Sequence, residues 1–233
     1  MTSETEKIIS NGVNIFVVIP AYNEEKRIRQ VLDDLSLLPY KVVVVDDASN
    51  DRTAEIVAQY SKVSLLRHKI NRDQGAALQT GNQYALAKGA DIIVHFDGDG
   101  QFLSQEIKDV LAPIVDDDYD IVFGSRFLSK QSDIPSFKKN IIFPLARLVN
   151  RIFLGIKTSD PQSGFRAMTR ETALRIQIEQ DGKAHCSEIM AKAFEYKLRI
   201  KEVPITVIYH EFGQGMGHGF KILKDILFSK ISK

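Results

Sequence analysis

The sequence has little cysteine, little net charge and no long apolar run. Each of these features argues against a class of partner or structure. Its 233 residues include 31 Lys and Arg against 30 Asp and Glu, so the formal net charge is only +1. This balance provides no basic field of the kind that attracts nucleic acid, and we expect no nucleic-acid partner. The one cysteine, Cys186, cannot form an intrachain disulfide, which fits a reducing compartment. We interpret it as a small buried hydrophobic residue rather than a catalytic thiol.

No apolar run approaches the ~20 residues that a membrane-spanning helix needs. The first fourteen residues also lack the apolar core of a signal peptide, so we expect contact with a membrane only from its surface. The length and the hydrophobic content of 44% suit one large α/β domain. We divide the chain into a flexible N-terminus (1–13), a main domain (14–210), and a glycine-rich loop with an amphipathic C-terminal helix (211–233).

Short apolar runs alternate with helical patterns along the first half of the chain. The expected strands are residues 15–19, 42–45, 63–66, 92–96 and 121–123. Helices are expected to open at Asn23, at Asn50 or Asp51, at Ala76 after a polar loop (71–75), at Ser104, and later at Ser187. Strands separated by helices of roughly ten to fifteen residues imply right-handed crossovers in a mainly parallel sheet. Because these strands are apolar throughout, helices should cover both faces. Residues 203–207 alternate but include Pro204, which predicts a strand at the sheet edge.

An acidic turn, Asp97-Gly98-Asp99-Gly100-Gln101, follows the strand expected at residues 92–96. In open α/β sheets, ligands bind outside the carboxyl ends of the strands. Two carboxylates this close together are costly to ionise without a cation, and oxygen ligands of this kind suit Mg²⁺ or Mn²⁺. The alternative is a solvated acidic turn, such as residues 116–118.

Further polar residues follow the neighbouring strands, and a parallel sheet would gather them at the same edge. They are Asn23, Asp46, Asp47 and Asn71. This arrangement is typical of a nucleotide site, although the sequence contains neither a Walker loop nor a G-x-G-x-x-G motif.

Six short motifs occur in order along the chain. They are Ile19-Pro20-Ala21-Tyr22-Asn23-Glu24-Glu25, Val45-Asp46-Asp47-Ala48-Ser49, Gln74-Gly75-Ala76-Ala77-Leu78, the acidic turn, Gly124-Ser125-Arg126-Phe127 and Ser163-Gly164-Phe165-Arg166. Together they resemble family 2 glycosyltransferases, most closely the branch of dolichyl- or polyprenyl-phosphate sugar synthases. The resemblance makes residues 14–210 the catalytic domain. It implies a single-domain, nucleotide-sugar-binding, Rossmann-like α/β fold of the GT-A type, and inverting transfer from a nucleoside-diphosphate sugar.

The resemblance also implies roles for individual residues. The nucleotide pocket would be lined by Pro20, Ala21, Tyr22, Glu24 and Gln74, with Asp47 facing the base. Asp97 would lie near the ribose and the metal, while Asp99 and Gln101 would hold Mg²⁺ or Mn²⁺ on the diphosphate. Such an ion would neutralise charge on the leaving nucleotide. The sequence departs from the family's pattern at Gly98, where alanine is common, and at Asp73, where glycine is common.

The implied acceptor is a polyprenyl (dolichyl-type) phosphate. Because a phosphate monoester is largely dianionic at pH 7, it needs cations to hold it rather than a general base. Arg126 is our first candidate for this role, since a planar guanidinium suits phosphate. Further candidates are Lys138, Lys139 and Arg147. Asp160 is the best candidate for a base, and the alternative is a turn cap before Pro161. The expected catalytic residues are Asp99, Asp160 and Arg126.

Two more residues, His185 and Glu188, have a functional and a structural interpretation, and a third, His95, has only a structural one. His185 and Glu188, near the start of a predicted helix, could contact the sugar or the metal, or could provide helix-cap electrostatics. His95 lies inside the central strand, and we expect it to be a core histidine.

A lipid-linked acceptor places the reaction at a membrane. We expect a peripheral protein on the cytoplasmic face, docked through an interfacial helix at residues 218–233, with residues 139–154 forming the acceptor groove. Two alternatives stay open: a glycosyltransferase with a carbohydrate hydroxyl as acceptor, and a non-catalytic nucleotide-sugar-binding partner of an integral membrane protein. A nucleotidyltransferase is a more distant third, because no glycine- and lysine-rich phosphate loop lies near the start.

Overall fold

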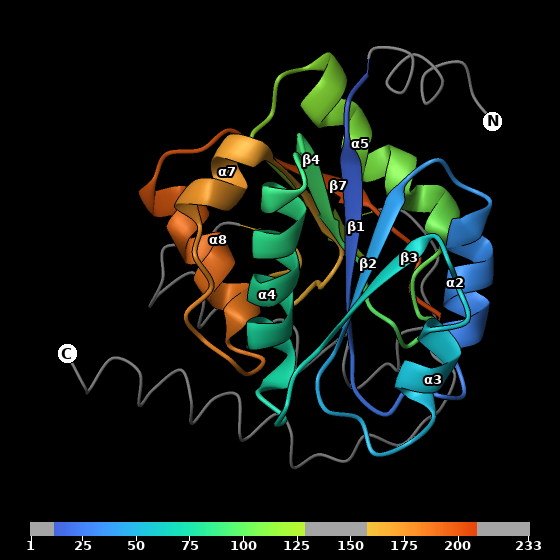
Figure 1. Cartoon of the computed structure of the whole chain (residues 1–233). Coiled ribbons are helices and arrows are strands. Elements are labelled where there is room, and N and C mark those ends of the chain that lie inside the picture. Colours follow the sequence, from blue (N-terminus) through green and yellow to red (C-terminus); the bar gives the residue numbers. More distant parts are fainter. Residues whose placement is uncertain (1–11, 129–157, 209–233) are drawn as a thin grey trace, which may run out of the picture.

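Seven strands form one sheet in the computed structural model, which describes residues 12–128 and 158–208 (Figure 1). The strands are β1 (Ile15–Ala21), β2 (Lys41–Asp46), β3 (Val63–Arg67), β4 (Ile92–His95), β5 (Ile121–Ser125), β6 (Arg166–Thr169) and β7 (Ile200–Pro204). Their order is β3-β2-β1-β4-β6-β5-β7. Strand β6 runs antiparallel to both neighbours, and the other pairs are parallel. The mainly parallel sheet expected from the sequence is confirmed.

Helices cover both faces of this sheet. One face carries α2 (Ile28–Ser36), α3 (Thr53–Val57) and α5 (Ile107–Asp116), the last preceded by the 3₁₀ turn η1 (Ser104–Glu106). The other face carries α4 (Asp73–Ala87), α7 (Arg170–Arg175) and α8 (His185–Glu195). Figure 1 shows α4, α7 and α8 together on one side of the strands.

The central strand β1 shows why the strands are apolar throughout. All seven of its residues are buried. Val17 and Ile19 pack in the core beneath α2, whereas Phe16 and Val18 pack in the core beneath α4. Successive side chains of a strand point to opposite faces of the sheet. When helices cover both faces, both sets of side chains are buried, so the strand is apolar throughout.

The antiparallel strand β6 brings a second chain segment to the ligand edge of the sheet. It starts at Arg166, which pairs with His95 at the end of β4 and with Phe123 in β5. The residues just before β6 therefore lie beside the turn that follows β4.

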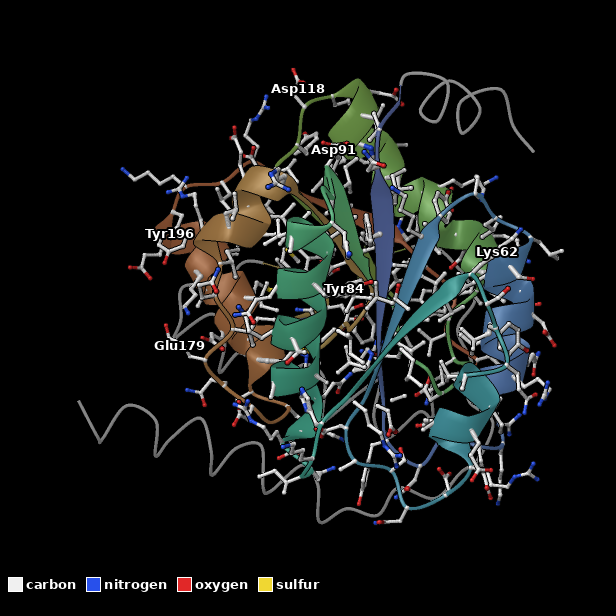
Figure 2. All side chains as sticks on the ribbon, viewed as in Figure 1. Lys62, Tyr84, Asp91, Asp118, Glu179 and Tyr196 are labelled. Carbon is white, nitrogen blue, oxygen red and sulfur yellow. The ribbon has the colours of Figure 1, made fainter. Side chains whose placement is uncertain are left out.

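At the opposite edge, the side chain of Asp91 accepts a 2.7 Å hydrogen bond from the backbone N–H of Asn14 (Figure 2).

Several boundaries predicted from the sequence are wrong, including the start of α8, which lies at His185 and not at Ser187. The strand expected at residues 203–207 is β7, at Ile200–Pro204, although it does lie at the sheet edge. Helix α2 begins at Ile28 rather than at Asn23, and a positive φ of 56° at Asn23 turns the chain ahead of the helix. Helix α4 already begins at Asp73, inside the segment expected to be a polar loop.

Strand β6 and helix α7 were not predicted at all. Several other predictions concern residues outside those that the structure describes: the N-terminal segment up to residue 11, Lys138, the stretch 139–154 with Lys139 and Arg147, and the glycine-rich loop and helix of residues 211–233. Among the described residues, the structure contains no helix with the length and apolar character needed to cross a membrane.

A glycine lets helix α4 approach the sheet closely. A β-carbon on Gly81 would overlap Cγ1 of Val18 in β1 and would lie 3.3 Å from Cγ2 of Val45 in β2. One turn further along α4, the hydroxyl of Tyr84 donates a 3.0 Å hydrogen bond to Ser64 in β3 (Figure 2). Gly81 therefore sets the spacing between α4 and the strands it covers.

We predict that Gly81→Ala lowers the free energy of unfolding, although alanine is ordinarily the better helix former by about 1 kcal/mol. The added methyl group has to displace the stiff, buried side chain of Val18, and overpacking of this kind costs roughly 1–3 kcal/mol. Chemical denaturation measures the difference. Gln83→Ala, on the exposed face of the same helix, is the control and should be neutral or slightly stabilising. A Gly81→Ala protein more stable than the wild type would contradict this packing.

Candidate active site

The acidic turn predicted from the sequence lies just after β4, at the carboxyl edge of the sheet. Asp97 is half-buried, and its Oδ1 accepts a 2.8 Å hydrogen bond from the side-chain amide of Gln74 in the first turn of α4. Oδ1 of Asp99 accepts a 3.0 Å hydrogen bond from the backbone N–H of Gln101. Four predicted site residues from two separate motifs therefore lie together.

The loop before β6 packs against Asp97. A β-carbon on Gly164 would lie 2.6 Å from Oδ2 of Asp97, so only glycine allows this approach. The aromatic rings of Phe96, Phe102 and Phe165 contact one another, with the Phe96 and Phe165 centroids 5.3 Å apart. This cluster ties the acidic turn to the loop before β6.

Three carboxylates influence one another at this edge. Burial, the neighbouring Asp99 and Cys186 raise the pKa of Asp97 to about 7, although Arg166 and His185 oppose the shift. Burial, Asp99 and Asp97 likewise raise the pKa of Glu24 to about 7. Because like charges disfavour ionisation, a cation at this edge would stabilise all three carboxylates in their charged form.

The ligand chemistry at the acidic turn fits a hard divalent ion. Asp97, Asp99 and Gln101 offer carboxylate and amide oxygens, which Mg²⁺ and Mn²⁺ prefer. Over residues 12–128 and 158–208, no group of three or more His, Cys, Asp or Glu side chains could hold a metal. An ion bound here would therefore complete its ligands with substrate phosphates and water, as Mg²⁺ commonly does.

Four residues predicted to line the nucleotide pocket lie at or just beyond the end of β1, namely Pro20, Ala21, Tyr22 and Glu24. Pro20 and Ala21 are buried within the strand, whereas the side chain of Tyr22 is 45% exposed just beyond it. The side chain of Asn23 accepts a 2.9 Å hydrogen bond from the backbone N–H of Asn50, which joins the turns after β1 and β2.

Asp47, predicted to face the base, is engaged within the protein. It is buried, and its Oδ1 lies 2.6 Å from Nδ1 of His68 and accepts a 3.0 Å hydrogen bond from the backbone N–H of Arg72. Asp47 therefore fixes the loop after β3 to the end of β2. Its contact with a base stays a prediction.

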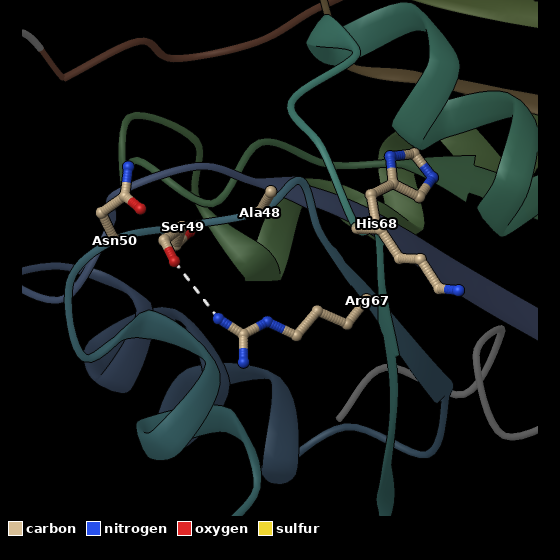
Figure 3. Close-up of a pocket in the computed structure, with 6 residues that line it drawn as sticks. Ala48, Ser49, Asn50, Arg67 and His68 are labelled. Atoms are coloured by element: carbon tan, nitrogen blue, oxygen red, sulfur yellow. Dashed lines mark hydrogen bonds between the residues drawn. The ribbon is translucent and has the colours of Figure 1, made fainter.

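A pocket of about 410 Å³ opens between the ends of β2 and β3 (Figure 3). It is lined by Ala48, Ser49, Asn50, Arg67, His68 and Lys69. Arg67 donates a 3.2 Å hydrogen bond to the carbonyl oxygen of Ser49 and pairs with Asp46 at 2.9 Å. A volume of this size with basic side chains suits a polar or anionic part of a small ligand. No lining role was predicted for these residues, although the basic run that begins at Arg67 was a visible signal in the sequence.

Arg126 and Asp160, both predicted as catalytic residues, form an ion pair. Nε of Arg126 donates to Oδ2 of Asp160 at 2.6 Å, and Nη2 donates to Oδ1 at 3.2 Å. Asp160 is only 1% exposed, and Glu202 in β7 accepts a 2.9 Å hydrogen bond from the backbone N–H of Ser159 beside it. Two-point contacts of this kind fix the plane of a guanidinium, so Asp160 orients Arg126.

His185, Glu188 and His95 all contribute to the fold. His185 is buried at the start of α8. Glu188 accepts backbone hydrogen bonds from the loop before α8 and pairs with Lys192 at 2.8 Å. Nε2 of the buried His95 lies 2.8 Å from Oδ1 of Asn82, which confirms the prediction of a core histidine.

Arg166 was part of a recognised motif, but no role was predicted for it. Its side chain is fully buried, donates to the carbonyl oxygens of Ser163 and Gly164, and lies 3.2 Å from Sγ of Cys186. Cys186 is buried as predicted, yet its sulfur has polar neighbours. An arginine inside an otherwise apolar stretch was the available signal.

Comparison with known proteins shows the family of the chain. Residues 16–176 match the family described as Glycosyl transferase family 2. The UDP-N-acetylglucosamine–dolichyl-phosphate N-acetylglucosaminyltransferase of Methanococcus voltae is 36% identical over 94% of this chain and 97% of its own length. The dolichyl-phosphate beta-glucosyltransferase of Dictyostelium discoideum is 31% identical over 84% of this chain and 67% of its own length. These names confirm the resemblance to the polyprenyl-phosphate branch.

The fold also has counterparts among solved structures. Glucosyl-3-phosphoglycerate synthase from Mycobacterium tuberculosis, crystallised with Mn²⁺, uridine diphosphate and phosphoglyceric acid, superposes with a TM-score of 0.75 over 98% of this chain and 81% of its own. At 20% identity, this likeness establishes the GT-A-like fold alone. From the family match and the identity to these relatives, the chain belongs to glycosyl transferase family 2 and is a glycosyltransferase.

Proposed function

We propose that this enzyme transfers a sugar, with inversion, from a nucleoside-diphosphate sugar to a polyprenyl (dolichyl-type) phosphate, using Mg²⁺ or Mn²⁺. The names of the relatives support the lipid-phosphate acceptor. The observation that carries the proposal is that one loop, residues 160–164, contacts both halves of the site. Its Asp160 pairs with Arg126, and its Gly164 packs against Asp97.

The acidic turn and its neighbours would hold the donor. Asp99 and Gln101 would bind the ion, with Asp97 beside them near the ribose, and Gln74 keeps Asp97 oriented. When bound, the ion would act as a Lewis acid that stabilises the departing nucleoside diphosphate. The pocket between β2 and β3 adds basic side chains close to Asp47, where the nucleoside would bind.

Arg126 would hold the acceptor phosphate, oriented by Asp160. In the transfer, a phosphate oxygen attacks the anomeric carbon, and the bond from that carbon to the nucleoside diphosphate breaks on the opposite face. The attacking oxygen already carries negative charge at pH 7, so the step needs no proton acceptor. Asp160 would then be a positioning residue rather than a base.

We also propose that the reaction takes place at the cytoplasmic surface of a membrane, because a polyprenyl phosphate resides in the bilayer. The support comes from the sequence: the stretches 139–154 and 218–233 carry apolar residues at helical spacing with Lys and Arg among them. Both stretches lie outside the described residues.

A screen of donors and acceptors tests the proposed function. Purified protein is incubated with UDP-, GDP- or dTDP-sugars and Mg²⁺, with and without a polyprenyl phosphate in detergent. We expect nucleotide release to require the lipid phosphate and the product to carry the inverted anomer. Nucleotide release that depends instead on a carbohydrate hydroxyl acceptor, with the lipid phosphate inert, would refute this acceptor class.

Replacing Asp99 tests the metal site. Asp99→Ala should lower turnover at least about a hundredfold, equivalent to about 3 kcal/mol of lost transition-state stabilisation, and chelation should abolish wild-type activity. Asp117→Ala removes an exposed carboxylate from another acidic turn and serves as the control, with activity unchanged. Calorimetric titration of Mn²⁺ in the presence of nucleoside diphosphate provides a readout that does not depend on turnover. Full activity of folded Asp99→Ala in excess chelator would rule out this site.

A second pair of substitutions tests the acceptor site. Arg126→Ala should raise the acceptor KM strongly, while nucleotide affinity changes little. Asp160→Asn should also act mainly on the acceptor KM, because it weakens the support of Arg126. Were Asp160 a general base, kcat would fall instead.

The control for these variants is Arg199→Ala, which removes another arginine paired with an aspartate, Asp120, next to the opposite end of β5. It should leave both kinetic constants unchanged. An equal loss of nucleotide binding in Arg126→Ala would show that Arg126 serves the donor instead.

A further inference from the structure

A buried positive charge lies behind the acidic turn. Arg166 is 0% exposed, and arginine keeps its proton in proteins. Its Nε and Nη2 donate to the backbone carbonyls of Gly164 and Ser163, and its Nη1 has no hydrogen-bond partner among the residues described. Carbonyl groups solvate a guanidinium but do not neutralise it, so a cation this deeply buried requires an anion nearby.

The sulfur of Cys186 has two nitrogen neighbours in this region. Nη2 of Arg166 lies 3.2 Å from Sγ, and Nε2 of His185 lies 3.4 Å from it. Nδ1 of His185 lies 2.9 Å from the carbonyl oxygen of Gly182, which can only accept, so Nδ1 carries a proton. An imidazolium could then donate through Nε2 to a thiolate, in the same way as the guanidinium does.

We propose that Cys186 is a thiolate in the folded protein, that it is the buried counter-ion of Arg166, and that this pair positions the donor site. The pair acts through the backbone. Arg166 holds the carbonyl groups of Ser163 and Gly164, and the Gly164 backbone packs on the Asp97 carboxylate. Cys186 is therefore a positioning residue, and only its effect on transfer rests on the proposed function.

The charged groups around the sulfur come from β6, α8 and the turn after β4. They are Arg166, His185 and Asp97. Burial, Arg166 and His185 also lower the pKa of the buried His95 well below its ordinary value, so His95 is neutral. Burial alone would raise the pKa of the Cys186 thiol, but His185 and Arg166 outweigh it and lower that pKa to about 6. Burial opposes a charged His185, yet Cys186 raises its pKa.

The sign of the pH dependence follows from this shift. A thiol titrates near ~8.5 in an unfolded chain, so its pKa is lower in the folded protein. The stabilisation from the ion pair is then complete above the unfolded value and is lost as the pH falls through about 6.

Ultraviolet absorbance tests the thiolate directly, because a thiolate absorbs strongly where a thiol does not. The chain has one cysteine, so the whole signal belongs to Cys186. Tyrosine ionises only near ~10, so a titration between weakly acid and neutral pH reports the thiol alone. We expect the native wild-type protein to show the thiolate band at pH 7 and to lose it near pH 6. A band that appears only at the ordinary thiol pKa would overturn the proposal, whatever the variants do.

A substitution series separates charge from packing. Cys186→Asp restores an anion, whereas Cys186→Ser and Cys186→Ala are close in size and neutral. An ion-pair role predicts that Asp retains kcat/KM for the donor, while Ser and Ala lose about 10- to 100-fold, as is usual for residues that orient ligand-binding groups. A small buried hydrophobic residue would produce the reverse order, with Ala and Ser tolerated and Asp damaging, and that order would refute the role.

Thermal unfolding provides a readout that does not need the transfer reaction. The difference in melting temperature between wild type and Cys186→Ser should be largest near pH 8 and should shrink as the pH falls through about 6. If the screen finds no lipid-phosphate transfer, the thiolate band and this pH dependence still decide the ion pair. A difference independent of pH would contradict it.

Discussion

A β-carbon on Gly164 would lie 2.6 Å from the Asp97 carboxylate, and this close approach of backbone to carboxylate is the constraint on which the site depends. It requires that the loop before β6 reach the edge where β4 ends, which in turn requires β6 to run antiparallel beside β4. The same loop carries Asp160, so the residue that orients Arg126 lies only four positions from the glycine that packs on Asp97. A parallel strand at this place would put that loop at the far edge of the sheet and would separate the two halves of the site.

The electrostatics of the site depend on carboxylates at the ligand edge and on buried basic side chains on the inner side of the Gly164–Asp97 contact. Toward the ligand edge, Glu24, Asp97 and Asp99 raise one another's cost of ionisation, an arrangement that a divalent ion and basic groups would relieve. Behind it, Arg166 and His185 partly offset the same repulsion at Asp97. The site is thus a layer of carboxylates backed by buried cations. Under the proposed function Asp97 serves the ligand, so the buried cations need another anion. The sulfur of Cys186 is a side-chain atom that Arg166 contacts.

The sequence was sufficient for β1 to β5 and for the acidic turn because strands buried on both faces are continuous apolar runs, and polar residues stop them at one edge. It was insufficient for β6. This strand has only four residues, two of which are the polar Arg166 and Thr169, and it pairs with β4, which lies far away in the chain. Strand β7 was misjudged because Lys201 and Glu202 interrupt its apolar pattern, as the exposed positions of an edge strand allow. Asp73 stands where glycine is common in the family, and it has a φ of 69°. The family's glycine is thus explained by a left-handed backbone conformation at this position, which Asp73 adopts here. The partners of Cys186 and Asp160 could not be predicted from the sequence. Which charged side chains pair depends on their distances in the folded protein.

The arrangement of carboxylates bears on the chemistry of the acceptor. A hydroxyl acceptor needs a base with an oxygen available for its proton. Asp97 accepts from Gln74, Asp99 accepts from Gln101, and both oxygens of Asp160 accept from Arg126. Each of these three carboxylates therefore already orients a neighbouring group. A phosphate acceptor makes the opposite demand, because it arrives charged and requires an oriented cation. Under the proposed function the Arg126–Asp160 pair would meet that demand, with Asp160 supporting the arginine instead of acting as the base that the sequence suggested.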